Sequence, residues 1–308
     1  MRDLDTLSSD VLSGARLAGF DPDPATVERM FDVFHDGFAD ESVNVNFKTT
    51  SRGSNRRGYF FRYCYVGDRK PGFAVAEDAG LLPHGAEPLY TLVPEAHERI
   101  PFAGGAVDCE VNHGLSKVWQ FTRGLIPVEE AISLRFAPGS LGDHEAFLRR
   151  FHLEHFSVIG ADKQHGSMNL YFWPLLDEQH TPEYVTEMIA SQHFPLPSHD
   201  VVAECCQSGV IALTFRWDSS ELERMCFYKP KHDRRTIPAS VSEFQVLADE
   251  TPSLVADPNF VIGWSFGSAG NYRKIEIDYT GDLLQLIATV MSGGNAGVAN
   301  RQESAAAP

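Results

Sequence analysis

Short runs of strand-like residues recur in pairs along the chain, and a short polar turn joins the two runs of each pair. The turns are rich in Gly, Asn, Asp and Ser, which is typical of β-hairpins, and they are too short for a parallel crossover. The strands of each pair are therefore predicted to be antiparallel. Five pairs are expected: 43–49 with 58–66, 106–111 with 116–121, 156–161 with 167–173, 209–217 with 221–228, and 259–267 with 271–279.

Segments with helical periodicity separate these pairs. Residues 24–38 carry an apolar stripe at helical spacing, and 142–151, 182–189 and 282–291 show shorter versions of the same pattern. The repeating unit is therefore helix–strand–strand–helix. An alternation of parallel strands and helices, the main alternative, does not fit turns of this length.

We expect an α+β fold in which five αββα units close ten antiparallel strands into a barrel, with the helices outside. Closure removes the exposed edges that an open sheet would leave. A barrel of about eight strands is filled by its own side chains, so ten strands should enclose a solvent-filled lumen that can hold an active site. One domain is predicted over residues 1–292, followed by a small-residue, polar and disordered tail over residues 293–308.

The two faces of the predicted strands differ in polarity. In the last strand, Ile275 and Ile277 lie on one face, whereas Lys274 and Glu276 lie on the other. Outer helices need apolar partners, so the apolar faces should point outward. The polar faces should then line the barrel.

The second strand of each pair carries a cation or an amide at nearly constant spacing. The successive intervals are 55, 52, 55 and 50 residues, and the five residues are Arg62, Lys117, Asn169, Arg224 and Lys274. Lys48 and Arg216, on first strands, are further candidates. Clustered cations are costly inside a protein unless an anion joins them, which predicts a small polyanion such as a diphosphate. The alternative is that these cations are solvated or pair with Glu110, Glu223 or Glu276.

Composition argues against several other partners. The chain has 308 residues, with 26 basic against 42 acidic residues and a formal charge of −16, which disfavours a nucleic-acid backbone. No apolar run approaches the ~20 residues that span a membrane, and residues 1–20 lack the apolar stretch of a secretory signal. The five cysteines show no C-x-x-C spacing, which indicates reduced thiols and a cytoplasmic location.

Two other motifs could indicate a function, but the residues around them do not support it. Residues 263–267 match the G-x-S-x-G nucleophile elbow, but a turn and a strand follow instead of a helix, and no histidine comes after His232. His152 and His155 are three residues apart, but no third ligand has the spacing of a metal site. Neither a hydrolase nor a metal centre is therefore expected.

Taken together, the repeat and these residues resemble the soluble aromatic prenyltransferases of the ABBA (PT-barrel) fold. The likeness is strongest to the clorobiocin/novobiocin-type and phenazine-type branch, and it covers residues 20–291. The resemblance implies transfer of a prenyl group from an isoprenoid diphosphate to an electron-rich aromatic ring. The stretches that carry it are 47–51, 117–119, 168–172, 222–228 and 261–281.

The resemblance also implies roles for single residues. Trp119 and Tyr171 would shield the allylic cation, while Glu276 could orient the acceptor or take its proton, as a carboxylate can. A salt bridge of Glu276 with Lys274 or Arg224 is the alternative. The diphosphate would be bound by Lys117, Asn169, Arg224 and Lys274 with help from Lys48, and the shared strand face adds Arg62 to this set.

Two positions depart from the family pattern. Metal-dependent members carry an Asp where Phe60 stands here, so neither magnesium nor another cofactor is expected. Members that use hydroxyphenylpyruvate carry an Arg near the position of Ser157, which places Ser157 in the predicted acceptor pocket. Without that Arg, a flatter phenazine-type polycycle is favoured; 4-hydroxyphenylpyruvate and a dihydroxynaphthalene remain open.

The sequence therefore predicts a monomeric, cytoplasmic dimethylallyltransferase that works without metal. Its partners would be small-molecule substrates, with no nucleic acid and no membrane. A barrel that binds a small phosphorylated ligand without catalysis is the alternative from another class, and such a barrel would not need Glu276.

Overall fold

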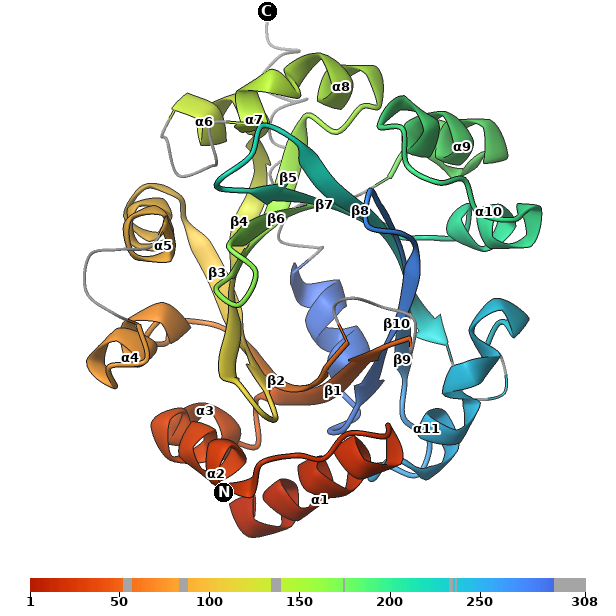
Figure 1. The fold of residues 1–308 in the computed structure, drawn as a ribbon. Coiled ribbons are helices and arrows are strands. Elements are labelled where there is room, and N and C mark those ends of the chain that lie inside the picture. The colour runs from red at the N-terminus through yellow and green to blue at the C-terminus, as the bar shows by residue number, and fades with distance from the viewer. Residues whose placement is uncertain are drawn as a thin grey trace, which may run out of the picture.

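The computed structural model describes residues 1–51, 57–82, 88–133, 140–173, 175–232, 235 and 237–290. Within them, antiparallel strands form a closed barrel in the order β1-β10-β9-β8-β7-β6-β5-β4-β3-β2 (Figure 1). The barrel closes where β1 pairs with β10, which sets Lys48 opposite Glu276. The strands are β1 (Asn44–Thr50), β2 (Tyr59–Val66), β3 (Phe102–Glu110), β4 (Gly114–Pro127), β5 (His155–Asp162), β6 (Ser167–Phe172), β7 (Val210–Arg216), β8 (Leu222–His232), β9 (Phe260–Gly267) and β10 (Tyr272–Asp278).

The five predicted hairpins and the barrel are confirmed, and the second hairpin is longer than expected. β3 and β4 extend beyond the predicted 106–111 and 116–121. The sequence hid the start of β3 because Gly104 and Gly105 interrupt its pattern. Gly104 is required there, since a Cβ at this position would lie 2.1 Å from the carbonyl oxygen of Tyr65 on the neighbouring strand.

Helices surround the strands on the outside of the barrel (Figure 1). The segment predicted as one helix over 24–38 is two helices that meet at Phe34, and the segment 142–151 is likewise divided at His144. The helices are α1 (Leu4–Leu17), α2 (Pro24–Val33), α3 (His35–Phe38), α4 (Gly72–Asp78), α5 (Pro88–Arg99), α6 (Val128–Ser133), α7 (Ser140–Asp143), α8 (Glu145–Arg150), α9 (Pro182–Ser191), α10 (His199–Cys205) and α11 (Gln245–Glu250), with 3-10 turns η1 (Asp177–His180) and η2 (Ala239–Phe244).

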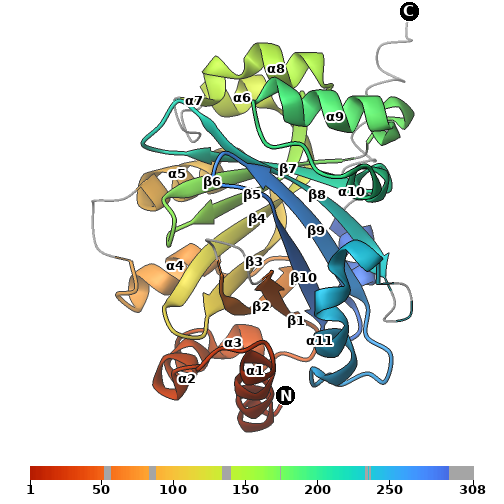
Figure 2. The ribbon, with the colours of Figure 1, turned by 45° about the vertical axis from the view of Figure 1, so that its right-hand side comes forward.

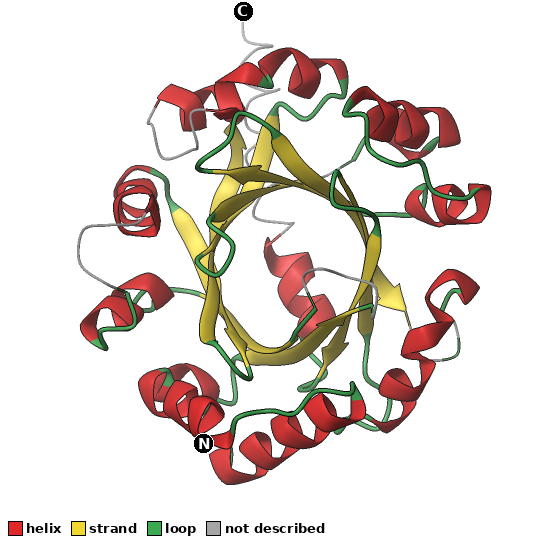
Figure 3. Cartoon of the chain, in the orientation of Figure 1, coloured by secondary structure: helices red, strands yellow, loops and turns green. Residues whose placement is uncertain are grey.

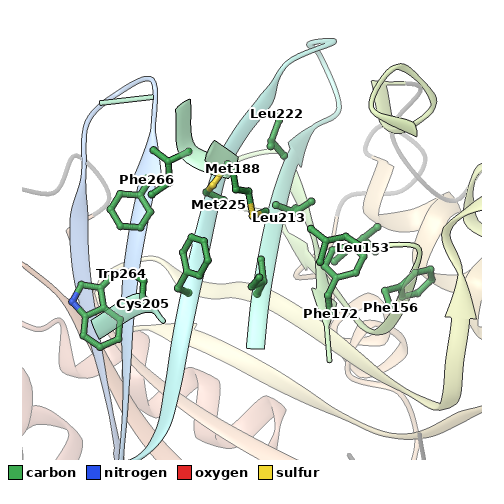
Figure 4. Packing of buried hydrophobic residues seen from close by; sticks show 14 of the residues in the cluster. Leu153, Phe156, Phe172, Met188, Cys205, Leu213, Leu222, Met225, Trp264 and Phe266 are labelled. Carbon is green, nitrogen blue, oxygen red and sulfur yellow. The ribbon is translucent and has the colours of Figure 1, made fainter. Parts of the chain in front are cut away.

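The hydrophobic core lies between the outer faces of the strands and these helices. Leu213, Met225 and Trp264 point outward from three neighbouring strands and pack with Met188 of α9 and Cys205 of α10 (Figure 4). All of them are at most 1% exposed. Burial of this apolar layer provides the main stabilisation of the barrel and leaves its inner face free for polar side chains.

The helix of residues 283–290 is an exception to the prediction that all helices lie outside. It lies across one end of the barrel, seen inside the ring of strands in Figure 3 and beside the strand ends in Figure 2. Because it follows β10 directly, this end is the one opposite the hairpin turns. Leu283 and Val290 pack there against inward-facing residues such as Val261 and Tyr228. The predicted tail, 293–308, lies outside the described residues.

Candidate active site

The lumen has two adjoining halves of opposite character. A polar cavity of about 470 Å³ lies at the end of the hairpin turns, and an apolar cavity of about 770 Å³ lies beside the helix of residues 283–290. The alternation of the strands had suggested a uniformly polar interior, but one half of the interior is apolar. The residues that line both cavities are Arg62, Trp119, Tyr171, Tyr228 and Glu276.

The structure brings the predicted cations together in the polar half. They come from strands spread around the whole barrel, and the side chains that line this cavity are Lys48, Arg62, Lys117, Arg224 and Lys274. Asn169 reaches the same group through a hydrogen bond from Nζ of Lys117 to its Oδ1, at 2.9 Å. Arg216 does not belong to it, because its side chain is 42% exposed and bonds Asp218. The equal spacing along the sequence thus corresponds to one ring of positive charge.

Asp108 is the main residue of this site that the sequence analysis missed. Its carboxylate is fully buried and accepts hydrogen bonds from Nζ of Lys48, at 2.5 Å, and from Nε and Nη2 of Arg62, at 2.8 and 3.1 Å. Burial alone would raise the pKa of Asp108, but Arg62 and Lys48 outweigh it and hold this pKa well below its usual range. A comparison of the first strands of the hairpins could have singled out Asp108 as an inward-facing residue, but its pairing with Arg62 across β2 and β3 depends on the strand register.

Glu276 lies at the boundary between the two halves. Its Oε2 accepts a hydrogen bond from Nη1 of Arg62 at 3.0 Å, so the expected pairing with Lys274 or Arg224 is replaced by one with Arg62. Its Oε1 receives no hydrogen bond from any residue within the described ranges. One oxygen is therefore held by protein and the other can meet a substrate.

Lys117 has an unusual electrostatic environment. Asp162, a second carboxylate that the sequence analysis did not single out, lies 3.4 Å from its Nζ. Burial is the main cause that lowers the pKa of Lys117, Asp162 opposes it, and Lys48 and Arg224 add to it; together they bring this pKa to about 7. An anion placed among these three cations would remove the repulsion and favour the charged form.

The two remaining cations bond neutral side chains. Nζ of Lys274 donates to the hydroxyl of Tyr228 at 3.0 Å, and Nε of Arg224 donates to Thr214 at 3.2 Å. Nη1 of Arg224 is buried without a hydrogen bond to a described residue, and Glu223 is 3.7 Å away. These donors can turn to an anion without breaking a close ion pair.

Aromatic rings form the wall between the halves. The guanidinium of Arg62 lies 4.4 Å from the ring centre of Trp119, whose ring is 5.0 Å from that of Tyr171. Tyr171 in turn lies 6.0 Å from Tyr228. The predicted pair Trp119 and Tyr171 thus continues into a third ring that the sequence analysis did not single out.

Ser157 is not where the sequence analysis placed it. It is buried in β5 but lines neither cavity, and the neighbouring residue Val158 lines the apolar one instead. The pairing of β4 with β5 is irregular between Phe121 and Ile126, directly beside this position. Such an irregularity shifts which residues face inward, and a comparison of sequence positions with the family does not reveal it.

The competing motifs have structural explanations. Ser265 of the G-x-S-x-G match lies within β9, and its hydroxyl is buried without a hydrogen bond to any residue that the structure describes. His152 lies at the surface, with Nε2 3.2 Å from Glu178. Across the described part of the chain, no three His, Cys, Asp or Glu side chains are grouped so that they could hold a metal ion. Phe60, at the position compared with a metal-binding Asp, has Nζ of Lys48 4.2 Å from its ring centre.

A barrel with a cationic half, an apolar half and an aromatic wall between them suits a substrate with an anionic head and an apolar tail. This is the class of barrel proteins that handle isoprenoid diphosphates. The profile of the family described as "Aromatic prenyltransferase Orf2" matches residues 2–291, and the chain belongs to this family. It is an aromatic prenyltransferase, which transfers a prenyl group to an aromatic acceptor.

Several curated proteins are similar along most of the chain. It is 30% identical over 296 residues to the 4-hydroxyphenylpyruvate 3-dimethylallyltransferase of Streptomyces niveus, which covers 91% of this chain and 85% of that protein. It is 23% identical over 278 residues to the 5,10-dihydrophenazine-1-carboxylate 9-dimethylallyltransferase of Streptomyces anulatus, covering 89% and 92%. It is 25% identical over 242 residues to the flaviolin linalyltransferase of Streptomyces virginiae, covering 76% and 79%.

None of the helices among the described residues is both long and apolar enough to cross a membrane.

Proposed function

We propose that the donor is dimethylallyl diphosphate, with its diphosphate in the polar cavity and its prenyl group at the aromatic wall. The observation that carries this proposal is that five residues line both cavities, so the two substrates would meet among them. Two of the relatives named above transfer dimethylallyl groups. The residues proposed to bind the diphosphate are Lys48, Arg62, Lys117, Asn169, Arg224 and Lys274.

The proposed reaction begins when the C–O bond between the dimethylallyl group and the diphosphate breaks. The leaving diphosphate takes the electron pair, and fixed cations stabilise its growing charge. The allylic carbocation remains beside Trp119, Tyr171 and Tyr228, whose ring faces stabilise positive charge and keep water away.

The second step forms a bond between the allylic carbon and the aromatic acceptor in the apolar cavity. The acceptor then loses the proton of the attacked position, and Oε1 of Glu276 is the proposed base. Arg62 keeps the other oxygen of this carboxylate in place. Glu276 is thus proposed to act on the acceptor rather than on the diphosphate.

The acceptor is proposed to be an electron-rich aromatic compound, and the phenazine-type polycycle remains a prediction. The comparison at Ser157 does not support it, because this residue lines neither cavity. The position of Ser157 therefore does not distinguish a phenazine-type acceptor from 4-hydroxyphenylpyruvate or a dihydroxynaphthalene.

We propose further that the reaction needs no magnesium, because five cations already face the place of the diphosphate. Formation of prenylated product in the presence of EDTA would support this, and a strict requirement for added magnesium would contradict it. The monomeric state and the cytoplasmic location remain predictions from the sequence, and sedimentation analysis of the purified protein tests the first.

The experiment that tests the function combines turnover with binding. The wild type should convert dimethylallyl diphosphate and an aromatic acceptor to product, whereas Glu276→Gln should lose about 10²- to 10⁴-fold in rate because the base is removed. Inorganic pyrophosphate should bind the two proteins with similar affinity in calorimetry. Pyrophosphate binding without any transfer in the wild type, across phenazine, naphthalene and phenylpropanoid acceptors, would favour the non-catalytic binding barrel.

A further inference from the structure

The charges of the apolar cavity restrict which aromatic compounds can enter it. Among its described lining residues, the charged side chains are Arg62 and Glu276, and both lie at the boundary with the polar half. The remainder of the wall is apolar or aromatic. At the end opposite the hairpin turns, the helix of residues 283–290 contributes aliphatic side chains, namely Leu283, Leu286, Ile287 and Val290.

Arg62 cannot easily serve as the partner of an anionic acceptor. Its guanidinium already donates to both oxygens of Asp108 and to one oxygen of Glu276. A third carboxylate would therefore join a cluster in which the positive charges of Arg62 and Lys48 are already matched by the buried carboxylates of Asp108 and Glu276. The side chains of Lys48 and Lys117 face the polar cavity instead, where the diphosphate is proposed to bind.

Among the described residues that line this cavity, a buried carboxylate on the acceptor would consequently find no cation of its own. Burying an unpaired charge is costly, and the carboxylate of Glu276 nearby adds repulsion. A hydroxyl or amine group on the acceptor is favourable in the same place, because it can donate a hydrogen bond to Oε1 of Glu276. Such groups also make an aromatic ring electron-rich enough to attack an allylic cation.

We infer that the acceptor of this enzyme is an uncharged hydroxy- or amino-substituted aromatic compound that carries no carboxylate. This inference rests on the proposed function, since it assumes that the apolar cavity holds the acceptor. It separates this chain from the two relatives named for 4-hydroxyphenylpyruvate and 5,10-dihydrophenazine-1-carboxylate, whose acceptors both carry one. A flat polycycle without the acid group remains compatible.

The test compares a carboxylic acid with its own uncharged methyl ester. Two such pairs are used, one from hydroxyphenylacetate and one from dihydrophenazine-carboxylate. Binding is measured in the presence of inorganic pyrophosphate, and turnover with dimethylallyl diphosphate. The ester should bind and react at least about tenfold better than the acid, given the cost of an unpaired buried charge. Equal or better binding of the acids would overturn the inference. If no acceptor is prenylated, the proposed function fails, but the binding comparison still decides the inference.

A gain of function provides the second arm. Leu286→Arg places a cation on the apolar helix, and Leu286→Gln is the matched control that is polar but uncharged. The ratio of acid to ester binding should rise about tenfold in Leu286→Arg relative to Leu286→Gln. The two variants should melt at similar temperatures. If they then show the same ratio of acid to ester binding, the added cation has no effect, which indicates that the acid already has a cation in the wild type and contradicts the inference.

Discussion

In the half of the lumen beside the hairpin turns, charged side chains gather and several of them form ion pairs. In the half beside the helix of residues 283–290, the described side chains are mostly apolar, and the charged ones, Arg62 and Glu276, lie at the boundary. Both halves are built from the same strands with the same alternation. They differ because the inward positions near the turns carry Lys, Arg and Asp, whereas those at the other end carry residues such as Cys64, Val158 and Val261. A single barrel can thus hold an anionic leaving group and an apolar acceptor apart, with the reacting atoms between them.

Among the variants that compare the two halves, the largest effect is expected in the polar half. Arg224→Met removes a buried cation whose Nη1 makes no hydrogen bond to a described residue, so kcat/KM for dimethylallyl diphosphate should fall about 10²- to 10³-fold through lost stabilisation of the leaving diphosphate. Steady-state kinetics measures this. Arg216→Met, which removes an exposed cation outside the ring, is the control and should change kcat/KM less than about twofold. Similar losses in both variants would break the comparison.

The aromatic wall should show an intermediate effect on the fate of the cation. Trp119→Leu removes a ring at the boundary, so transfer should fall about tenfold and more of the donor should end as dimethylallyl alcohol, because water reaches the cation. Trp173→Leu is the matched control, since Trp173 lines only the apolar cavity. Trp173→Leu should raise the KM for the acceptor without increasing the share of donor that ends as dimethylallyl alcohol. Product analysis by chromatography distinguishes the two variants.

A smaller effect concerns protons in the polar half. The pKa of Lys117 is lowered to about 7, so this lysine is largely neutral above that pH, and a bound diphosphate raises its pKa again. Pyrophosphate binding at about pH 8 should therefore take up a proton, and the affinity should fall as the pH rises above 7. Calorimetry in buffers of different ionisation enthalpy measures the uptake. Lys117→Met should abolish it; a persistent uptake of the same size would assign the proton to another group.

The smallest effect is expected at Ser157. Its side chain lines neither cavity, so Ser157→Ala should change the KM for any acceptor less than about twofold, as is usual for a change away from the site. Val158→Ala, one residue further along β5, enlarges the apolar cavity and should alter acceptor preference. A strong effect of Ser157→Ala would restore the original placement of this residue in the acceptor pocket.

Much of the site was predictable because its pattern is local. The hairpins are recognisable from short turns and alternating residues, and each cation lies at the same point of its own hairpin. The ion-pair partners of these cations were not predictable from a local pattern. Asp108 meets Lys48 and Arg62 only through the register of three strands, and that register depends on the packing of the whole barrel.

The sequence by itself determined the alternation along each regular strand, because successive side chains of a strand point to opposite faces. This alternation places five cations on one strand face: Lys48, Arg62, Lys117, Arg224 and Lys274. The tertiary structure alone decided that the helix of residues 283–290 lies across one end of the barrel, that Glu276 bonds Arg62, and that Ser157 lines neither cavity. These features depend on contacts between segments far apart in the chain, so no local pattern of residues encodes them.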